Sequence, residues 1–600
     1  MSRLLNVVKR VVFTSTIIGG GACSLILYNV GTSSWSDSHT WSSATRHYLT
    51  NKFMVVLGFI SFRDLVKNSR NVRETQENLL MDNLVKNTAT LYGKEFGFEK
   101  MNSVAEFRKQ HPLTRYSHYQ PYVEKIQNGD LLALTADIPL QLAVTSGTSG
   151  KSSLLPTTNF IFTRFFLSGI ALLFQRLQET HPEWVTLQKS MKLFYTPRWK
   201  YTETGLRIGP NSSNPDSAQR IYHLYSTPPP AYRILTEPEA LYIHLLFGLL
   251  DQNLGNIEAN FASTVYTGFR TLESRWEELV QDIQTGTINS NLNIPSDIRE
   301  QLEAVMKPNP ERAEELRKEF TAGFENIAKR IWPNLNLIMC TTTGTMKMYT
   351  SSLKSKYCRD TQTYSPIYGA SEGLLGVNLY PDSTQSLYCL IPSAQFFEFI
   401  RQEDSDTDNP DTLLLHQLEK GQAYEVVVTN GSGLYRYRMG DVVQVESFFN
   451  ELPMVRFLHR QGQMLNVHGE KISEEVFFTT LKKCEKTWNI RLRDYTTAES
   501  VLSESSALPH YLLFIEPESE CCDLNLDLPD TTLRSDHPVY ESFRAKGSID
   551  KIQVIQVKRG SFQALQEMML ATSMASSNQF KVPRVLRKEE HVKYLLENSI

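Results

Sequence analysis

The chain has 600 residues, of which 41% are hydrophobic and 21% charged, and its formal net charge at pH 7 is −3. This length allows two or more domains with a large core, and the near-neutral charge gives no reason to expect bulk binding to nucleic acid or to an anionic membrane. Seven cysteines are scattered without a Cys-x-x-Cys pair, so neither a zinc site nor a disulfide framework is indicated.

The N-terminal segment differs from the start of a typical soluble enzyme. Arg3, Lys9 and Arg10 precede residues 11–30, which carry no charge. A run of about 20 residues can cross the hydrocarbon core of a bilayer as a helix. Because glycine, serine and threonine dilute the run, four interpretations stay open: a membrane anchor, a cleaved signal peptide, a mitochondrial presequence, or an apolar tail that spans nothing. We expect a membrane-associated protein, with the endoplasmic reticulum as one candidate and the cytoplasm as the alternative.

Hydrophobic spacing then predicts the elements along the chain. The run at 53–62 is too short to cross a membrane alone, so it is expected to form a buried or interfacial helix. Further helices are predicted at 69–87, 160–179, 237–251, 257–285, 298–330 and 473–488, and an extended segment at 193–199. Short strands are predicted at 337–341, 387–391, 395–400, 424–429 and 442–445.

The stretch 145–156, TSGTSGKSSLLP, has the composition of an anion-binding loop. It follows an extended apolar run at 131–144 and precedes the helix at 160–179. Glycines allow close approach of the backbone, N–H groups and hydroxyls donate hydrogen bonds, and a lysine adds charge. The candidate residues are Thr145, Ser146, Gly147, Thr148, Ser149, Gly150 and Lys151. A Walker A loop would need glycine in place of Thr145, so that interpretation fails, and a plain Ser/Gly linker remains the alternative.

Two further segments carry residues that suit a nucleotide. In 368–378, YGASEGLLGVN, Ser371 could bind an α-phosphate and Glu372 could hold Mg²⁺, whereas the alternative is a turn with an exposed glutamate. In 433–443, GLYRYRMGDVV, Asp441 could accept hydrogen bonds from ribose hydroxyls, whereas the alternative is a strand with exposed arginines and a turn aspartate. The segments 456–475 and 579–584 indicate little on their own.

In this order the motifs resemble those of the auxin-responsive acyl-acid amido synthetases, the Gretchen Hagen family, within the adenylate-forming superfamily. TSGTSG resembles the phosphate loop of that family, YGASEGLLGVN its Tyr-x-x-Ser-Glu signature, and GLYRYRMGDVV its third motif. Three shorter matches are IWPN at 331–334, FFEF at 396–399 and NQFKVPR at 578–584. The resemblance covers residues 92–587.

The resemblance implies an α/β fold of the adenylate-forming, firefly-luciferase-like type. It implies a large adenylation domain at 65–459 and a small mobile C-terminal domain at 460–600, which follow the N-terminal apolar segment that the sequence itself indicates at 1–64. The implied reaction is a two-step ligation, in which ATP and a carboxylic acid form an acyl-adenylate and pyrophosphate, and an amino acid then displaces AMP to form an amide. ATP and Mg²⁺ are the implied cofactors.

The resemblance also implies roles for single residues. The phosphates are held by Thr145, Ser146, Gly147, Thr148 and Ser149, the adenine lies by Tyr368, and the ribose is bound by Asp441. At the reacting end, Ser371 lies by the α-phosphate, Glu372 reaches Mg²⁺ and Lys581 stabilises charge on the α-phosphate, while Arg460 and Lys471 lie in the hinge-side nucleotide motif. Adenylation builds negative charge at phosphorus, and its electrostatic stabilisation is the main task of such a site.

One departure from the family motif leaves alternatives open. Family loops carry a lysine several places beyond the second glycine, whereas Lys151 follows Gly150 directly. The alternatives are a non-catalytic, membrane-associated scaffold or binding protein of the same fold, and an acyl-CoA ligase, which differs only in the acceptor of the second step.

The basic flank before residue 11 predicts a lumenal catalytic body, whereas ATP chemistry favours the cytosol, and the sequons at Asn211 and Asn430 bear on this choice. The acid, the amine and the oligomeric state are not determined.

Overall fold

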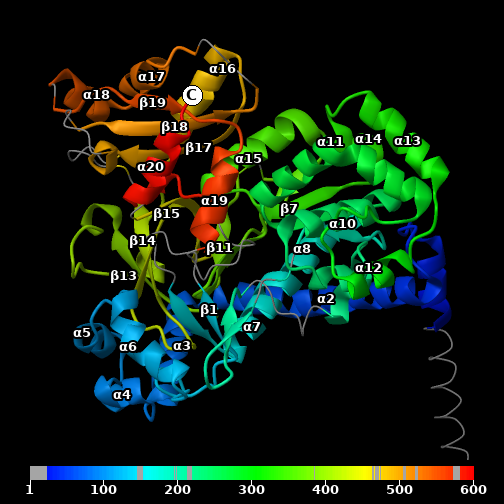
Figure 1. The fold of residues 1–600 in the computed structure, drawn as a ribbon. Coiled ribbons are helices and arrows are strands. Elements are labelled where there is room, and N and C mark those ends of the chain that lie inside the picture. Colours follow the sequence, from blue (N-terminus) through cyan, green and yellow to red (C-terminus); the bar gives the residue numbers. More distant parts are fainter. Residues whose placement is uncertain are drawn as a thin grey trace, which may run out of the picture.

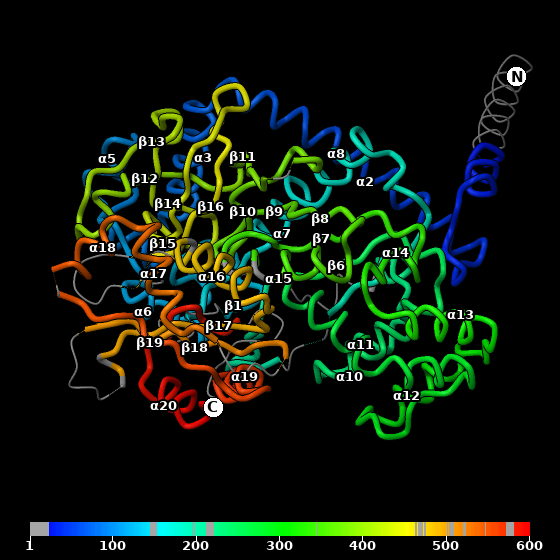
Figure 2. Tube along the Cα trace, turned by 90° about the horizontal axis from the view of Figure 1, so that it is seen from above, coloured from blue at the N-terminus to red at the C-terminus, as the bar shows by residue number. Residues whose placement is uncertain are grey.

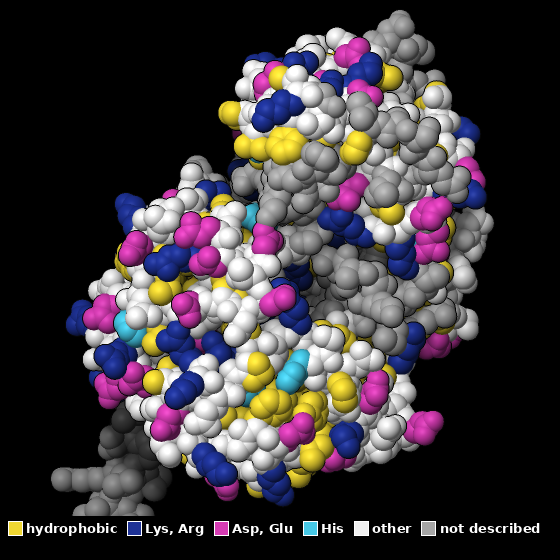
Figure 3. Space-filling model, turned by 90° about the vertical axis from the view of Figure 1, so that its left-hand side faces the viewer, with side chains coloured by type: hydrophobic (Ala, Val, Ile, Leu, Met, Phe, Trp, Pro, Cys, Tyr) yellow, Lys and Arg dark blue, Asp and Glu magenta, His cyan; other side chains and the backbone are white. Residues whose placement is uncertain are grey.

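The computed structural model describes residues 23–600 apart from 145–152, 195, 197–198, 212–218, 384, 462–464, 466–471, 473, 504–508, 520–523, 547 and 572–580. The described chain forms an antiparallel sheet with its helices, a helical lobe around a parallel sheet, and a C-terminal body (Figure 1). On the face shown in Figure 3, basic and acidic side chains are interspersed, in agreement with the small net charge.

The N-terminal part of the described chain is helical. The helix Cys23–Thr32 leads into the long helix α2, Trp41–Asn68, which contains the run expected at 53–62. The helices that follow are α3 (Val72–Asn87), α4 (Leu91–Glu95), α5 (Val104–Gln110) and α6 (Tyr116–Gln127). Thr40 caps α2, since its hydroxyl accepts a hydrogen bond from the Ser43 N–H in a capping box.

An eight-stranded antiparallel sheet, in the order β13-β12-β14-β15-β16-β11-β10-β9, carries the segments from 367 to 460. Its strands are β9 (Ile367–Ala370), β10 (Gly373–Val377), β11 (Tyr388–Leu390), β12 (Phe396–Arg401), β13 (Leu413–Leu414), β14 (Ala423–Thr429), β15 (Tyr437–Phe449) and β16 (Leu452–Arg460). The inner face packs on α3, α5 and α6 in one core that includes Leu80, Phe107 and Tyr119.

A smaller sheet, in the order β2-β1-β5-β4, lies beside this core. Its strands are β1 (Gln141–Val144), β2 (Leu154–Thr157), β4 (Lys200–Tyr201) and β5 (Arg207–Gly209). β1 and β2 pair antiparallel, so the predicted phosphate loop joins the two strands of a hairpin, and α7 follows only after β2.

The helix Asn159–Thr180 consists of α7 (Asn159–Arg164), a π-helical part η2 (Phe165–Ala171) and α8 (Leu172–Thr180). By length and composition this is the one helix among the described residues that could cross a membrane. It packs along α2, where a Cβ on Gly58 would lie 2.2 Å from the Ala171 carbonyl oxygen. The close approach of two helices in the same body identifies it as a packed helix of the fold.

The helical lobe surrounds a parallel sheet in the order β3-β6-β7-β8. The strands are β3 (Ser190–Lys192), β6 (Asn256–Phe261), β7 (Leu337–Thr341) and β8 (Gln362–Tyr364). The helices are α10 (Glu237–Leu250), α11 (Ala262–Thr285), α12 (Ser296–Glu303), α13 (Pro310–Thr321), α14 (Ile327–Ile331) and α15 (Lys347–Ser352).

Three predicted elements of this lobe were wrong in part. The described residues between 193 and 199 form no strand, and the neighbouring strand β3 ends at Lys192. The helix expected at 257–285 begins only at Ala262, because residues 256–261 pair as the strand β6 between β3 and β7. The helix expected at 298–330 is three helices, since Pro308 and Pro310 interrupt the first and a turn at Gly323 separates the others.

The C-terminal body has its own sheet, in the order β19-β18-β17-β20. The strands are β17 (Leu492–Glu499), β18 (Tyr511–Pro517), β19 (Gln553–Gln556) and β20 (Val585–Leu586), and the helices are α16 (Glu474–Trp488), α17 (Leu528–Asp536), α18 (Pro538–Ala545), α19 (Ser561–Ala571) and α20 (Glu589–Glu597). Figures 1 and 2 show this body on the side of the molecule opposite α2, next to β16 and α15. The domain boundary at 459/460 stays a prediction.

Candidate active site

Asp441 is the centre of the candidate site. It lies in β15 opposite Arg460 of β16, and it is 3% exposed. Arg460 Nε donates to Asp441 Oδ1 over 2.5 Å, and the Tyr368 hydroxyl donates to Asp441 Oδ2 over 2.8 Å. Gly440 adopts φ of +78°, a left-handed conformation that a glycine accepts without strain, directly before the aspartate. Each carboxylate oxygen of Asp441 is thus fixed by a residue of another strand, Oδ1 by Arg460 of β16 and Oδ2 by Tyr368 of β9.

Glu372 is buried next to this pair, in the turn between β9 and β10. Its side chain is 7% exposed, so the alternative of a turn with an exposed glutamate is wrong. Burial raises the pKa of Glu372, and the nearby Arg460 charge opposes that rise. A carboxylate kept away from water in this way favours a neighbouring cation.

Two asparagines hold the turn that carries Ser371 and Glu372. Asn211 Nδ2 donates to the Ser371 carbonyl over 3.1 Å, and Asn430 Nδ2 donates to the Glu372 carbonyl over 2.8 Å. The Asn211 side chain also accepts hydrogen bonds from Gln141 of β1 and from the Thr157 hydroxyl of β2, each over 2.9 Å. Asn211 therefore ties the β1–β2 hairpin, which the predicted phosphate loop joins, to Ser371.

These two asparagines are the ones that begin the glycosylation sequons. A glycan is attached through Nδ2, and both Nδ2 atoms donate hydrogen bonds to the Ser371–Glu372 turn. Asn430 is also only 2% exposed. In the folded chain both sequon asparagines therefore hold the Ser371–Glu372 turn in place. The sequence pattern alone did not indicate this role.

Lys581 reaches the site from the C-terminal body. Its Nζ lies 4.1 Å from the centre of the Phe261 ring at the end of β6. Burial, assisted by the charge of Arg460, lowers the pKa of Lys581 to about 8, while Glu474 and Asp441 oppose that shift. Asp441 and Arg460 thus act on Lys581 across the junction between the two bodies.

The segment around Lys581 is anchored through Arg584, which is 2% exposed. The Arg584 guanidinium donates to Asp494 and to the Tyr495 carbonyl of β17, and it lies over the Tyr495 ring at 4.6 Å. On the other side of the junction, the Tyr349 hydroxyl of α15 donates to Asp494 Oδ2 over 2.9 Å. The large body thus contacts the strand that positions the lysine.

The two arginines of the third motif have a structural role. Arg438 is 4% exposed and binds Glu425 of β14 through Nε at 3.0 Å and Nη2 at 2.6 Å. Arg436 makes the same two-pronged contact with Glu398 of β12, at 3.0 Å for both bonds. The alternative of exposed arginines on a strand is therefore wrong. Both are buried ion pairs that hold β12, β14 and the start of β15 in register.

The predicted site residues thus divide into two groups. Tyr368, Ser371, Glu372, Asp441, Arg460 and Lys581 are described and lie around one point of the structure, at which the antiparallel sheet meets the C-terminal body. Thr145, Ser146, Gly147, Thr148, Ser149, Gly150, Lys151 and Lys471 lie outside the described residues.

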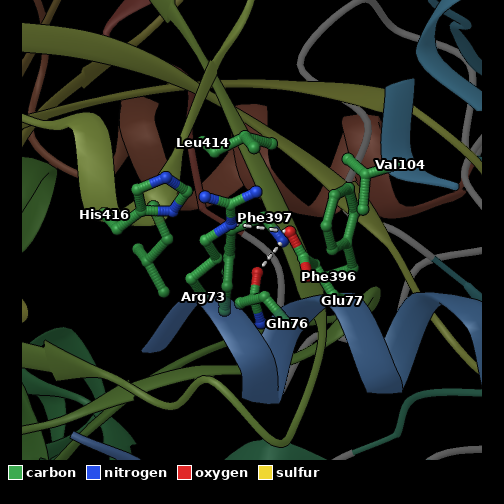
Figure 4. Close-up of a pocket in the computed structure, with 9 residues that line it drawn as sticks. Arg73, Gln76, Glu77, Val104, Phe396, Phe397, Leu414 and His416 are labelled. Carbon is green, nitrogen blue, oxygen red and sulfur yellow. Dashed lines mark hydrogen bonds and ion pairs between the residues drawn. The ribbon is translucent and has the colours of Figure 1, made fainter. Parts of the chain in front are cut away.

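A separate pocket opens between α3 and β12 (Figure 4). Three of its polar side chains are engaged within the protein. The Gln76 amide donates to the carbonyls of Pro392 and Gln395 and accepts from the Phe397 N–H. Arg73 pairs with Glu77 at 2.8 Å, as the close-up shows. Because Arg73, Gln76 and Glu77 already pair within the protein, we do not take this pocket as the candidate site.

Comparison with known proteins agrees with the arrangement. Three family models match the chain: the GH3 family N-terminal domain at residues 61–363, the central domain at 388–460 and the C-terminal domain at 475–590. The 4-substituted benzoates-glutamate ligase GH3.12 of Arabidopsis thaliana is 28% identical over 562 residues, covering 88% of this chain and 95% of that protein.

Two comparisons concern one relative. The indole-3-acetic acid-amido synthetase GH3.15 of Arabidopsis thaliana is 31% identical over 575 residues, covering 88% of this chain and 93% of that protein. The solved structure of GH3.15 acyl acid amido synthetase superposes with a TM-score of 0.79 and 28% identity, over 90% of this chain and 95% of that one. The chain therefore has the α/β fold of that synthetase and belongs to the GH3 family, which is the Gretchen Hagen family that its motifs resemble.

Proposed function

We propose that the group around Asp441 binds and activates ATP in this chain, an ATP-dependent acid–amino acid ligase that works through an acyl-adenylate. The observation that carries the proposal is the buried carboxylate of Asp441, which Tyr368 and Arg460 hold by hydrogen bonds. Glu372 and Lys581 lie close enough to interact electrostatically with Arg460. The cationic side chains, Arg460 and Lys581, suit the negative phosphates of a nucleotide, and the carboxylate of Glu372 suits its metal ion.

Asp441 is suited to hold the ribose. Each carboxylate oxygen can accept two hydrogen bonds, and one on each oxygen is already used by Arg460 or Tyr368. The second acceptor position on each oxygen suits one of the two ribose hydroxyls. Because Arg460 and Tyr368 fix the plane of the carboxylate, the ribose meets acceptors that need no rearrangement.

Glu372 has the chemistry of a Mg²⁺ ligand. Mg²⁺ prefers carboxylate oxygens together with phosphate oxygens, and a buried carboxylate with a raised pKa gains when a cation neutralises it. When bound, the ion would supply positive charge to the phosphates. The seven residues from Thr145 to Lys151 complete the proposal as phosphate-binding residues, on the strength of their composition and the family motif.

Lys581 and Arg460 act on the reacting phosphorus. In the first step the carboxylate oxygen of the acid bonds to the α-phosphorus and the bond to pyrophosphate breaks. In the second step the amine nitrogen of the amino acid bonds to the acyl carbon, a proton leaves the nitrogen, and AMP departs. The α-phosphoryl oxygens carry negative charge in both steps, and a lysine and an arginine at this point stabilise it.

The relatives suggest the first compounds to test. Their names specify 4-substituted benzoates with glutamate, and indole-3-acetic acid. We propose an aromatic or similarly flat carboxylic acid and an amino acid as substrates of this chain. An acyl-CoA ligase would use a thiol in place of the amine, and a non-catalytic scaffold would bind without turnover.

ATP–pyrophosphate exchange with a panel of such acids tests the function. We expect exchange that requires an acid, followed by amide formation when the matching amino acid is added. Glu372→Gln should raise the Mg²⁺ concentration at half-maximal exchange by about tenfold, since one charged ligand is lost. The exposed Glu589→Gln is the control and should leave it unchanged. Absence of both exchange and ATP binding would favour the non-catalytic alternative.

Association with a membrane through residues 11–30 is a further part of the proposal, with the catalytic body in the cytosol. The uncharged run supports the association. A lumenal body would offer Asn211 and Asn430 as glycan acceptors, and a glycan on either would remove a hydrogen bond from the Ser371–Glu372 turn. Protease protection of sealed microsomes measures the side directly, and a protected catalytic body would contradict the cytosolic assignment.

A further inference from the structure

The outer face of α2 is apolar where a solvent-facing helix is normally polar. Six large apolar side chains on this helix are between 48% and 59% exposed, namely Trp41, Leu49, Phe53, Val56, Phe59 and Ile60. The opposite face of α2 is buried, and at Gly58 it lies against Ala171. Trp41 packs edge-on against Trp35, with ring centroids 5.0 Å apart, whereas the other five side chains project from the face of α2 that is turned away from Ala171.

Spacing places four of these side chains in one stripe. Leu49, Phe53, Val56 and Ile60 follow one another at intervals of four, three and four residues, which is the repeat of one helix face. A stripe of this length exceeds the scattered single apolar residues that are usual on soluble surfaces. Such a face is typical of a surface that contacts another molecule or a membrane.

The charges on the same face have one predominant sign. Its exposed charged residues are the basic Arg46, Lys52, Arg63 and Lys67 and the acidic Asp64, a balance of four positive to one negative. The whole chain carries −3, so the face is basic against an acidic average. An apolar stripe flanked by basic side chains is the pattern of a helix that lies in a membrane interface.

We propose that α2 lies along the surface of a membrane that contains anionic lipids. Its apolar stripe would enter the boundary between headgroups and acyl chains, and its basic side chains would contact lipid phosphates or carboxylates. The catalytic body would rest on this helix, and the C-terminal body would face away from the membrane, since Figures 1 and 2 show it on the opposite side.

Two observations favour a membrane over a second copy of the chain. Two copies of this face would bring four basic residues against four, with only one acidic residue from each to compensate. In addition, the helix Cys23–Thr32, the end of the uncharged run, packs against the start of α2: Val30 and Ala44 share a core, and Asn29 Nδ2 donates to the Tyr48 hydroxyl over 3.0 Å. The end of the uncharged run is thus held next to α2.

The test uses the full chain with a fluorophore on one cysteine. Val56→Cys is labelled with a polarity-sensitive dye in a background in which Cys23, Cys521 and Cys522 are serine. Val539→Cys, on α18 in the C-terminal body, is the matched control, since that valine is 48% exposed and lies far from α2. The labelled proteins are mixed with vesicles of phosphatidylcholine alone or with one-third phosphatidylserine.

We expect the Val56→Cys label to shift to shorter wavelength with phosphatidylserine vesicles, while the Val539→Cys label does not shift. High salt or Lys52→Glu with Arg63→Glu should abolish the shift. Phe53→Ser with Ile60→Ser should weaken the partition by about tenfold or more. Three results would overturn the proposal: no binding to the vesicles, binding in which the residue-56 label stays in water, or a shift without vesicles that grows with protein concentration and so identifies a second copy.

Discussion

The charge of Lys581 controls ATP binding in our proposal, and Lys581→Arg tests this directly. Burial lowers the pKa of this lysine from 10.5 to about 8, a difference that corresponds to about 3 kcal/mol between its charged and neutral forms. In the free protein, half of the molecules therefore carry the charge at pH 8 and about one in ten at pH 9. Bound phosphates favour the charged form, so binding above this pH requires uptake of a proton.

The expected consequence is a pH-dependent affinity. The dissociation constant for Mg²⁺-ATP should rise about tenfold between pH 7 and pH 9, since the ionisation of the phosphates themselves is complete below this range. Lys581→Arg should show little of this rise, because a guanidinium stays charged to pH 12 and above. Isothermal titration calorimetry at constant ionic strength measures both proteins, and Lys593→Arg, an exposed lysine of α20, is the control that should retain the wild-type slope.

Stability should depend on the same group with the opposite sense. The unfolded chain holds the Lys581 proton up to pH 10.5, whereas the folded chain releases it near pH 8, so the unfolded state binds more protons between these values. The contribution of Lys581 to folding therefore rises as pH increases through this window. The reasoning is refuted if the wild-type affinity for ATP is flat from pH 7 to 9, or if Lys581→Arg shows the same slope.

Two further substitutions test the framework of the site. Tyr368→Phe removes the hydroxyl that donates to Asp441 and should lower the free energy of unfolding by about 1–3 kcal/mol, measured by urea denaturation, together with the affinity for ATP; unchanged ATP affinity would contradict the assigned position of the ribose. Arg438→Leu leaves the buried carboxylate of Glu425 unpaired and should cost about 3–5 kcal/mol. The exposed pair of Arg233 provides the comparison, since Arg233→Leu should leave the midpoint within error, and equal losses for both arginines would count against the burial argument.

Local structure followed from the sequence where the hydrophobic spacing matched one type of element over its whole length. The strand predicted at 337–341 is β7, Leu337–Thr341, and the helix predicted at 473–488 is α16, Glu474–Trp488. Periodicity failed at 257–261, where Ile257, Ala259 and Phe261 alternate with Glu258 and Asn260, which is the pattern of a strand, and the segment pairs with β3 and β7. It also overran the prolines near residue 310, where the hydrophobic repeat continues across separate helices.

The order of motifs, the family and the residue types of the candidate site were determined by the sequence alone, because these depend on which side chains are present. The tertiary structure decided which of them meet. The register of β15 and β16 brings Asp441 to Arg460, the turn after β9 buries Glu372, and the C-terminal body brings Lys581 to the same point. Such contacts join residues far apart in the chain and depend on desolvation, which no local pattern records. For the same reason, only the tertiary structure showed that Arg436 and Arg438 are buried and that the apolar stripe of α2 is exposed.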